Sequence, residues 1–376
     1  MAVLTFGHQM VKPYKLNFIK STRLYLMYSL VFLLLALTYS CKQHNEKLAV
    51  VWNGGNAIGI QIPKYLLADS ETSTLKIILA SGKGTPILGK FNVDGDMVMF
   101  SPLIPLSTGL DYQVLQGDKL LGTLNVPIDT NEKKPEVVKI YPQVDTLPIN
   151  ALKLYIEFSK PMRTGRVLDH INLLHGKDTM HNVFLDLEPE LWDSTGKVLT
   201  LWIDPGRIKR GLVLNKELGN PLTNKDHYTF TISPDWKDSK GVKLGKQYTK
   251  TFIAGARDSQ IPDINKWRFN IPQAKSQATL MINLGEPLDH FLLMEAVTIL
   301  DAKGKPVDGF ISTGNYDREL QFSPRQPWAA QRYTLRVNAK LEDVASNNLN
   351  RVFDRDMKQE VRKDNVYYER YFNVKP

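Results

Sequence analysis

Three histidines within a short stretch of the chain, His170, His175 and His181, are the first side chains in the sequence that could bind a metal ion. The same stretch holds three acids, Asp178, Asp186 and Glu188. Imidazole and carboxylate groups are ligands for divalent metals. The spacing matches no metal-binding motif, and residues five apart on one strand point to opposite faces. We therefore expect loop and strand-edge histidines here, with a metal site as the weaker alternative.

Two glycine-containing segments could serve a cation or a phosphate, but each is better explained as a turn. Asp94-Gly95-Asp96 lacks the further ligands of a calcium loop. Asn53-Gly54-Gly55-Asn56 is followed by no helix pattern and no Lys. A Gly-x-Ser-x-Gly motif does not occur, and the chain has one cysteine, Cys41. The sequence thus predicts no catalytic residue, no metal and no cofactor, and we expect a protein that is not an enzyme.

The segment before Cys41 predicts export and lipidation. Residues 1–23 carry four basic residues and no acid, and the apolar stretch Leu24–Leu37 follows. This stretch is shorter than the ~20 residues of a membrane span and suits a signal peptide. Its end, Leu37-Thr38-Tyr39-Ser40-Cys41, resembles a bacterial lipoprotein signal, with Tyr39 where a small residue is usual. The resemblance implies removal of residues 1–40 and acylation of Cys41, for example with palmitate. A signal anchor with an incidental cysteine is the alternative.

Length, composition and charge narrow the remaining classes. The 376 residues suffice for two to four domains, and 43% hydrophobic with 23% charged residues is ordinary for globular chains. A single cysteine excludes an intramolecular disulfide. Without residues 1–40 the net charge falls from +9 to +5, and no run of five Lys or Arg occurs. We therefore expect no nucleic-acid partner.

After a polar tether at residues 41–47, the chain has the pattern of an all-β protein. Short apolar runs alternate with turn residues, as in sandwich strands: Ala49–Trp52, Ala57–Ile62, Leu75–Leu79 and Met97–Phe100. Two windows, Gly165–His170 and Phe291–Ala296, allow a turn or two of helix. The C-terminal segment Tyr367–Val374 is typical of a last strand.

Short sequences recur at a nearly constant offset, which predicts tandem domains. The first and last copies share Lys83-Gly84-Thr85-Pro86 with Lys303-Gly304-Lys305-Pro306, Gly89 with Gly309, Phe100-Ser101-Pro102 with Phe322-Ser323-Pro324, and Tyr112 with Tyr333. A longer middle copy contains Tyr228 and an insertion before it. The middle and last copies also share the pair Ser159-Lys160-Pro161 and Gly285-Glu286-Pro287.

These segments resemble the bacterial Ig-like domain of the S-layer-protein type. The residues that carry the resemblance are Ile156-Glu157-Phe158-Ser159-Lys160-Pro161-Met162, Tyr228–Ile232, Asp238-Ser239-Lys240-Gly241 and Tyr248–Phe252. The third copy has Leu341–Asn347, with Ser346 where glycine is usual. The resemblance covers the middle copy best and the first copy least. It implies β-sandwiches that act as spacers or binding platforms, and it transfers no catalytic residue.

We therefore expect three tandem Ig-like β-sandwich domains after an N-terminal lipoprotein signal peptide. The expected divisions are 1–40 signal peptide, 41–47 tether, 48–130 domain 1, 135–256 domain 2 and 261–376 domain 3. The linkers between the domains are short, so a semi-rigid rod is expected.

Two features are candidates for partner contact. Arg207, Lys209 and Arg210 make a basic loop in the insertion of the middle copy, and loops are where β scaffolds place binding; a solvated turn is the alternative. Tryptophans of the second and third copies could stack on sugars or pack in the core: Trp192, Trp202, Trp236, Trp267 and Trp328.

The expected function is that of a non-catalytic structural, adhesive or binding platform in a bacterial cell envelope. Lipid on Cys41 would attach it to a membrane, the outer membrane above all, and the partner would be another envelope protein or a glycan. The alternative function is a glycan-binding lipoprotein of a polysaccharide-capture system, which exposed tryptophans would favour. An enzyme would instead show converging carboxylates or histidines in a cleft.

Overall fold

Side chains alternate between the interior and the solvent along most strands, as the apolar patterning predicts. In β20 (Glu319–Pro324), for example, every second residue is buried. The computed structural model describes residues 47–68, 72–129, 131–355 and 364–376. The predicted signal peptide and Cys41 lie outside the described residues. Among the described residues, no helix combines the length and apolar character needed to cross a bilayer.

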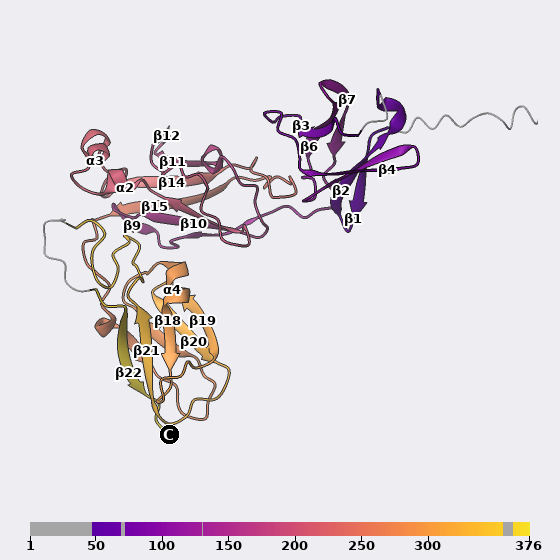
Figure 1. The fold of residues 1–376 in the computed structure, drawn as a ribbon. Coiled ribbons are helices and arrows are strands. Elements are labelled where there is room, and N and C mark those ends of the chain that lie inside the picture. The colour runs from indigo at the N-terminus through magenta and orange to yellow at the C-terminus, as the bar shows by residue number, and fades with distance from the viewer. Residues whose placement is uncertain (1–46, 69–71, 130, 356–363) are drawn as a thin grey trace, which may run out of the picture.

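The first domain is a sandwich of two antiparallel sheets (Figure 1). One sheet has the order β1-β2-β5-β4, with strands β1 (Ala49–Asn53), β2 (Asn56–Pro63), β4 (Gly89–Asp94) and β5 (Met97–Pro102). The other has the order β3-β6-β7, with strands β3 (Leu75–Leu79), β6 (Leu110–Gln116) and β7 (Lys119–Val126). The 3-10 helix η1 (Lys64–Leu66) follows β2.

The third domain repeats this strand order. Its first sheet is β16-β17-β20-β19, with β16 (Arg268–Asn270), β17 (Leu280–Asn283), β19 (Gly309–Gly314) and β20. Its second sheet is β18-β21-β22, with β18 (Val297–Leu300), β21 (Arg332–Asn338) and β22 (Tyr367–Asn373). Two short helices, η3 (Ile264–Lys266) and α4 (His290–Ala296), complete it.

The second domain is more elaborate. A sheet of β8 (Val137–Tyr141), β10 (Lys153–Phe158) and β13 (Val198–Trp202) packs on a five-stranded sheet, β12-β11-β14-β15-β9. The five strands are β9 (Thr146–Pro148), β11 (Ile171–His175), β12 (Asp178–Thr179), β14 (His227–Ile232) and β15 (Tyr248–Gly255), and β9 runs parallel to β15. The 3-10 helix η2 (Val167–His170) precedes β11. The insertion between β13 and β14 holds α2 (Pro205–Ile208) and α3 (Val213–Leu218).

Gly89 and Gly309, one pair of glycines of the repeat, each start a strand where the backbone crosses an aromatic ring. A Cβ on Gly89 would lie 2.6 Å from Cε2 of Phe100, and one on Gly309 would lie 2.5 Å from Cζ of Phe322. Any larger residue would have to displace a buried ring or its own strand. The recurring glycines therefore mark the same close approach in two copies of one fold.

The recurring tyrosines fix the same corner in all three domains. The hydroxyl oxygen of Tyr112 accepts the backbone N–H of Ser107 at 2.9 Å. Tyr228 accepts that of Thr223 at 2.9 Å, and Tyr333 accepts that of Ala329 at 3.0 Å. Each ring is buried, so its hydroxyl needs this partner.

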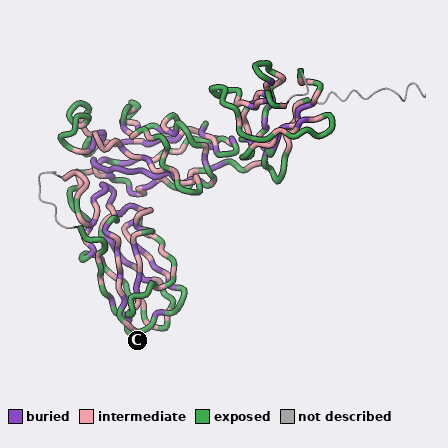
Figure 2. The backbone as a smooth tube through the Cα atoms, viewed as in Figure 1, coloured by how far each residue is buried: buried purple, intermediate pink, exposed green. Residues whose placement is uncertain are grey.

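Buried hydrophobic residues form three clusters, one inside each sandwich. Figure 2 marks the buried residues of each domain in purple. Val344, which follows β21 in the third domain, is the exception, because it belongs to the cluster of the second domain. The chain is therefore all-β and built of tandem Ig-like domains, as predicted. Both windows predicted to allow helix are short helices, η2 and α4. The expectation of a rod is wrong, because the third domain bends away from the line of the first two (Figure 1).

Candidate functional site: the junction of the second and third domains

A buried ion pair joins the second domain to the third. Nζ of Lys153, in the central strand β10, lies 3.0 Å from Oδ2 of Asp289 and 2.7 Å from Oε2 of Glu342. The hydroxyl of Tyr155 donates to the same Asp289 oxygen at 2.6 Å. The other oxygen of Asp289 accepts the backbone N–H of Leu292 and caps helix α4. One carboxylate thus starts a helix in one domain and binds a cation from the other.

Lys153, Asp289 and Glu342 form the seam between the second and third domains. The charges at this seam shift the pKa values of Lys153 and Tyr155, both in β10. Burial lowers the pKa of Lys153, but Asp289 and Glu342 outweigh burial and raise it above its ordinary value. Burial and the Asp289 carboxylate together raise the pKa of Tyr155. Lys153 is therefore an ammonium, Tyr155 is a neutral hydroxyl donor, and every group has a partner of complementary character.

Aromatic rings extend the seam on one side. Tyr141 of β8 stacks on His290 with ring centroids 4.1 Å apart, and Phe291 packs against Tyr141 and Tyr155 at 5.5 and 4.8 Å. Nδ1 of His290 lies 2.7 Å from the buried carboxylate of Asp317. Offset and edge-to-face ring pairs add to the apolar area that they bury.

The linker between the second and third domains, residues 257–260, makes contacts with both domains. Asn150 donates its side-chain amide to the carbonyl of Asp258 and accepts the backbone N–H of Asp258, both at 2.8 Å. Arg257 lies 3.0 Å from Asp354 and donates to the carbonyl of Ile208 at 3.3 Å. By contrast, the first two domains meet through a few contacts, such as the donation of Arg163 to the carbonyl of Thr108 at 3.0 Å.

The basic loop predicted for partner contact lies at this junction, and its three residues differ in role. Arg207 is 7% exposed, and three of its nitrogens donate to backbone carbonyls, those of Asn182, Leu218 and Gly219. It holds the insertion together from inside, and its guanidinium is engaged within the second domain. Arg210 pairs with Asp354 at 2.7 Å, and Nζ of Lys209 lies 4.4 Å from the ring centroid of Phe353. Both residues contact the third domain, and their binding of any further partner stays a prediction.

Three carboxylates converge at the linker, and no sequence motif groups them. Oxygens of Asp258, Glu286 and Asp343 all lie within 4.8 Å of one another. Asp343 is 2% exposed, and the other two are half-buried. Burial raises the pKa of Asp343 to about 7, with the two neighbouring carboxylates adding to the effect. Burial likewise raises the pKa of Glu286, and Asp258 adds to it. These are the residues of the junction that could hold a metal ion.

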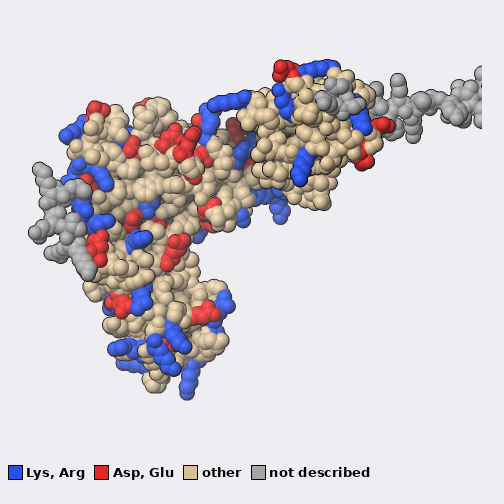
Figure 3. All heavy atoms as spheres, viewed as in Figure 1, with Lys and Arg blue, Asp and Glu red and all other residues tan. Residues whose placement is uncertain are grey.

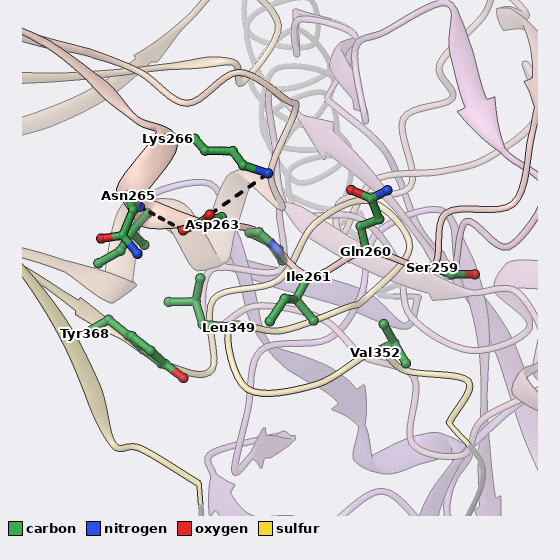
Figure 4. Close-up of a pocket in the computed structure, with 11 residues that line it drawn as sticks. Ser259, Gln260, Ile261, Asp263, Asn265, Lys266, Leu349, Val352 and Tyr368 are labelled. Carbon is green, nitrogen blue, oxygen red and sulfur yellow. Dashed lines mark hydrogen bonds and ion pairs between the residues drawn. The ribbon is translucent and has the colours of Figure 1, made fainter. Parts of the chain in front are cut away.

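A groove of about 550 Å³ runs beside the same linker (Figure 4). Its acid, Asp263, accepts the backbone N–H of Asn265 at 2.9 Å and lies 4.0 Å from Nζ of Lys266. Its tyrosine, Tyr368, donates to Asn350 at 2.9 Å. The carboxylate of Asp263 and the hydroxyl of Tyr368 are therefore both engaged in local structure.

The histidines and tryptophans singled out in the sequence lie elsewhere. His170 stacks on Trp236 and His175 pairs with Asp226 at 3.2 Å, while His181 is exposed, so within the described residues the three do not converge. Trp236, Trp267 and Trp328 are buried, and Trp192 and Trp202 are half-buried and pack against the core of the second domain. The tryptophans of the second and third domains are core residues and offer no exposed stacking platform.

No family model and no curated protein matches the sequence. Solved structures do match. One is native alpha-2-macroglobulin from Escherichia coli spanning domains MG0-NIE-MG1, at 13% identity over 55% of this chain and 66% of that chain, with a TM-score of 0.22. Another is the N-terminal part of the bacterial S-layer protein SbsC, at 12% identity over 65% and 45%, with a TM-score of 0.22. A third is titin domains I67–I69, at 9% identity over 84% and 91%, with a TM-score of 0.18.

This chain spans two thirds or less of the macroglobulin and S-layer fragments. At TM-scores of 0.22 or less, these matches assign no activity, ligand or partner to this chain.

Proposed function

We propose that the protein is a lipid-anchored platform of a bacterial cell envelope, acylated at Cys41 and attached to the outer membrane. Its tandem Ig-like domains hold a binding surface at a fixed orientation, and the protein performs no catalysis. The observation that supports this most is the seam of Lys153, Asp289 and Glu342, which fixes the third domain on the second. A binding surface that is already ordered loses less entropy when its partner binds.

The surface for a further envelope protein is the insertion of the second domain. Leu212 and Val213 are exposed there, next to the basic Lys209 and Arg210. An apolar patch rimmed by charge is typical of protein contact sites. The repeated residues, in contrast, serve turns and packing, as the glycines and tyrosines of the fold do, which favours a scaffold over an enzyme.

The anchor is tested by labelling cells with a clickable palmitate. The wild-type protein should be labelled and should fractionate with the outer membrane, whereas Cys41→Ala should be neither labelled nor membrane-bound. Label that persists in Cys41→Ala would contradict the lipoprotein assignment. For the partner surface, a photo-crosslinking residue at Val213 should trap a defined envelope protein, and one at exposed Asp118 should not.

A second candidate, binding of an acidic glycan, has one specific observation in its favour. Tyr367 and Tyr371 alternate on the exposed face of β22, 51% and 58% exposed. The guanidinium of Arg336 lies 5.5 Å from the first ring centroid, and that of Arg332 lies 4.9 Å from the second. Basic side chains gather over this end of the third domain (Figure 3). Arg336 is paired with Glu369 at 2.7 Å, so the positive charge beside the rings comes chiefly from Arg332. Rings for stacking beside a positive charge suit an acidic polysaccharide.

A glycan panel on the purified protein separates the two candidates. Binding of uronic-acid polysaccharides that Tyr371→Ala abolishes, with neutral glucans unbound, would favour the glycan function. No binding across the panel would leave the protein-contact platform as the function.

A further inference from the structure

The second and third domains contain the same aspartate turn ahead of their last strand. Asp238 pairs with Met162 across an isolated bridge, and Asp343 pairs with Leu288 in the same way. In each turn, one aspartate oxygen accepts two backbone N–H groups, those of Lys240 and Val242 in one copy and of Ala345 and Asn347 in the other. The two turns are structural copies, so the residues around them can be compared one by one.

In the second domain, the ammonium group of a lysine lies beside this turn. Lys160, two residues before Met162, places Nζ 2.8 Å from Oε2 of Glu132 and 4.0 Å from Oδ2 of Asp238. Glu132 comes from the linker that precedes the domain. Its hydrogen bonds with Lys160 and Lys240 lower the pKa of Glu132 to about 2. A linker carboxylate and a turn carboxylate thus share one ammonium.

In the third domain, the same position carries the opposite charge. Glu286, two residues before Leu288, stands where Lys160 stands in the copy. Its neighbours are again a linker acid, Asp258, and the turn acid, Asp343. Throughout the described ranges, no Lys, Arg or His forms an ion pair with any of the three carboxylates. Lys266, whose charge acts on Glu286, pairs with Asp263 at 4.0 Å instead.

We infer that Asp258, Glu286 and Asp343 bind a divalent cation, Ca²⁺ above all, in the place that the Lys160 ammonium takes in the second domain. Two oxygens bound to one Ca²⁺ lie at most about 5 Å apart, so carboxylates within 4.8 Å of one another suit a single ion. An all-oxygen, anionic donor set favours Ca²⁺, Mg²⁺ or Mn²⁺ over softer metals. Ca²⁺ best tolerates the irregular geometry of ligands from three separate segments.

The ion ties the linker into the third domain. The backbone of Asp258 is already gripped by Asn150 of the second domain. Binding of the Asp258 carboxylate to the loop and turn of the third domain therefore strengthens the junction from its other side. This role deepens the proposed platform and rests on it, whereas cation binding itself depends on neither the lipid anchor nor a partner.

The test uses the full-length protein, purified in detergent and stripped of metal with EDTA. Titration calorimetry with CaCl₂ should give saturable binding of one ion by the wild-type chain. The melting temperature of the third domain should rise by about 5 °C or more at ten times the dissociation constant. Glu286→Lys, which restores the cation of the copy, should abolish binding and should melt without calcium as high as the wild type does with it.

Two further variants separate loss of the cation ligand from misfolding and from a change in net charge. Glu286→Gln preserves shape and should weaken binding at least tenfold, which covers the case in which Glu286→Lys does not fold. Glu217→Lys, at an exposed position on α3, makes the same change in net charge and should bind calcium like the wild type. Absence of saturable binding in the wild type, or equal binding in Glu286→Gln, would overturn the inference. Neither outcome touches the anchoring experiment, so the two proposals fail separately.

Discussion

The ammonium of Lys153 lies 3.0 Å from the carboxylate of Asp289, and this pair joins the central strand of one domain to the helix cap of the next. Both side chains are withdrawn from solvent, at 10% and 3% exposure. A buried pair adds little over an apolar contact of the same shape, but either charge alone is costly. The pair therefore acts chiefly to specify one arrangement of the two domains.

Replacing Asp289 should reveal the cost of leaving the Lys153 charge buried without this partner. We expect Asp289→Ala to lower the free energy of unfolding by about 3–5 kcal/mol, because Lys153 and the Tyr155 hydroxyl lose a buried partner. Urea denaturation measures the change. Asp263→Ala also removes a helix cap with an ion pair, but near the surface, and should cost about 1 kcal/mol. Equal losses in the two variants would contradict the assigned role of the seam.

Arg207 and Arg210 should differ in stability although both belong to the basic loop. We expect Arg207→Ala to cost about 2–3 kcal/mol, because backbone carbonyls at Asn182 and Leu218 lose a charged donor in a buried place. Arg210 is 65% exposed in its side chain, so Arg210→Ala should cost under about 1 kcal/mol. Thermal unfolding of the two variants decides the matter, and an unchanged melting temperature for Arg207→Ala would show that the guanidinium is not structural.

The recurring tyrosines should each stabilise their own corner. Tyr333→Phe removes the acceptor for the Ala329 N–H and should cost about 1 kcal/mol in the third domain. Tyr371→Phe changes an exposed hydroxyl and should be close to neutral. If chemical denaturation finds the two variants alike, the corner hydrogen bond has no net value.

The carboxylates of Asp258, Glu286 and Asp343 form an acidic cluster, and its presence predicts that the stability of the third domain depends on pH. Asp343 fixes the direction of this dependence. Its pKa is raised from 3.8 to about 7, so the folded state holds the proton more tightly than the unfolded state does. The stabilisation that protonated Asp343 contributes to the folded state is complete below pH 4 and is lost as the pH rises toward about 7. In EDTA, the third domain should therefore melt lower at pH 8 than at pH 5, and calcium should reduce the difference.

Two variants test that assignment. Asp343→Asn should flatten the slope between pH 4 and 7, whereas Asp301→Asn, in the turn that follows β18 in the same domain, should keep it. The groups facing Asp343 are Asp258 and Glu286, with Lys266 acting on Glu286. A slope that survives in Asp343→Asn would place the titration on another group.

The sequence was sufficient where a feature is local and repeated. Gly89 with Gly309, and Tyr112 with Tyr333, recur because each copy of the sandwich needs them at the same point. The bend was not predictable in this way, because Asp289 and Lys153 lie 136 residues apart and neither has a motif.

The acidic cluster was predictable from the sequence only in part. Lys160 and Glu286 are visible as a matched pair in the sequence, and their opposite charge was the available signal. What the sequence lacks is the position of Asp258, which only the fold of the linker brings to the loop.

The proposed platform requires the second and third domains to form one fixed unit, and electron paramagnetic resonance tests this requirement most directly. In a Cys41→Ser background, spin labels at Asp178→Cys in β12 and Lys303→Cys in an exposed turn of the third domain report the distance across the junction. We predict a single narrow distance distribution that broadens in Asp289→Ala. A broad distribution in the chain with an intact Lys153–Asp289 pair would contradict the fixed junction and the platform built on it.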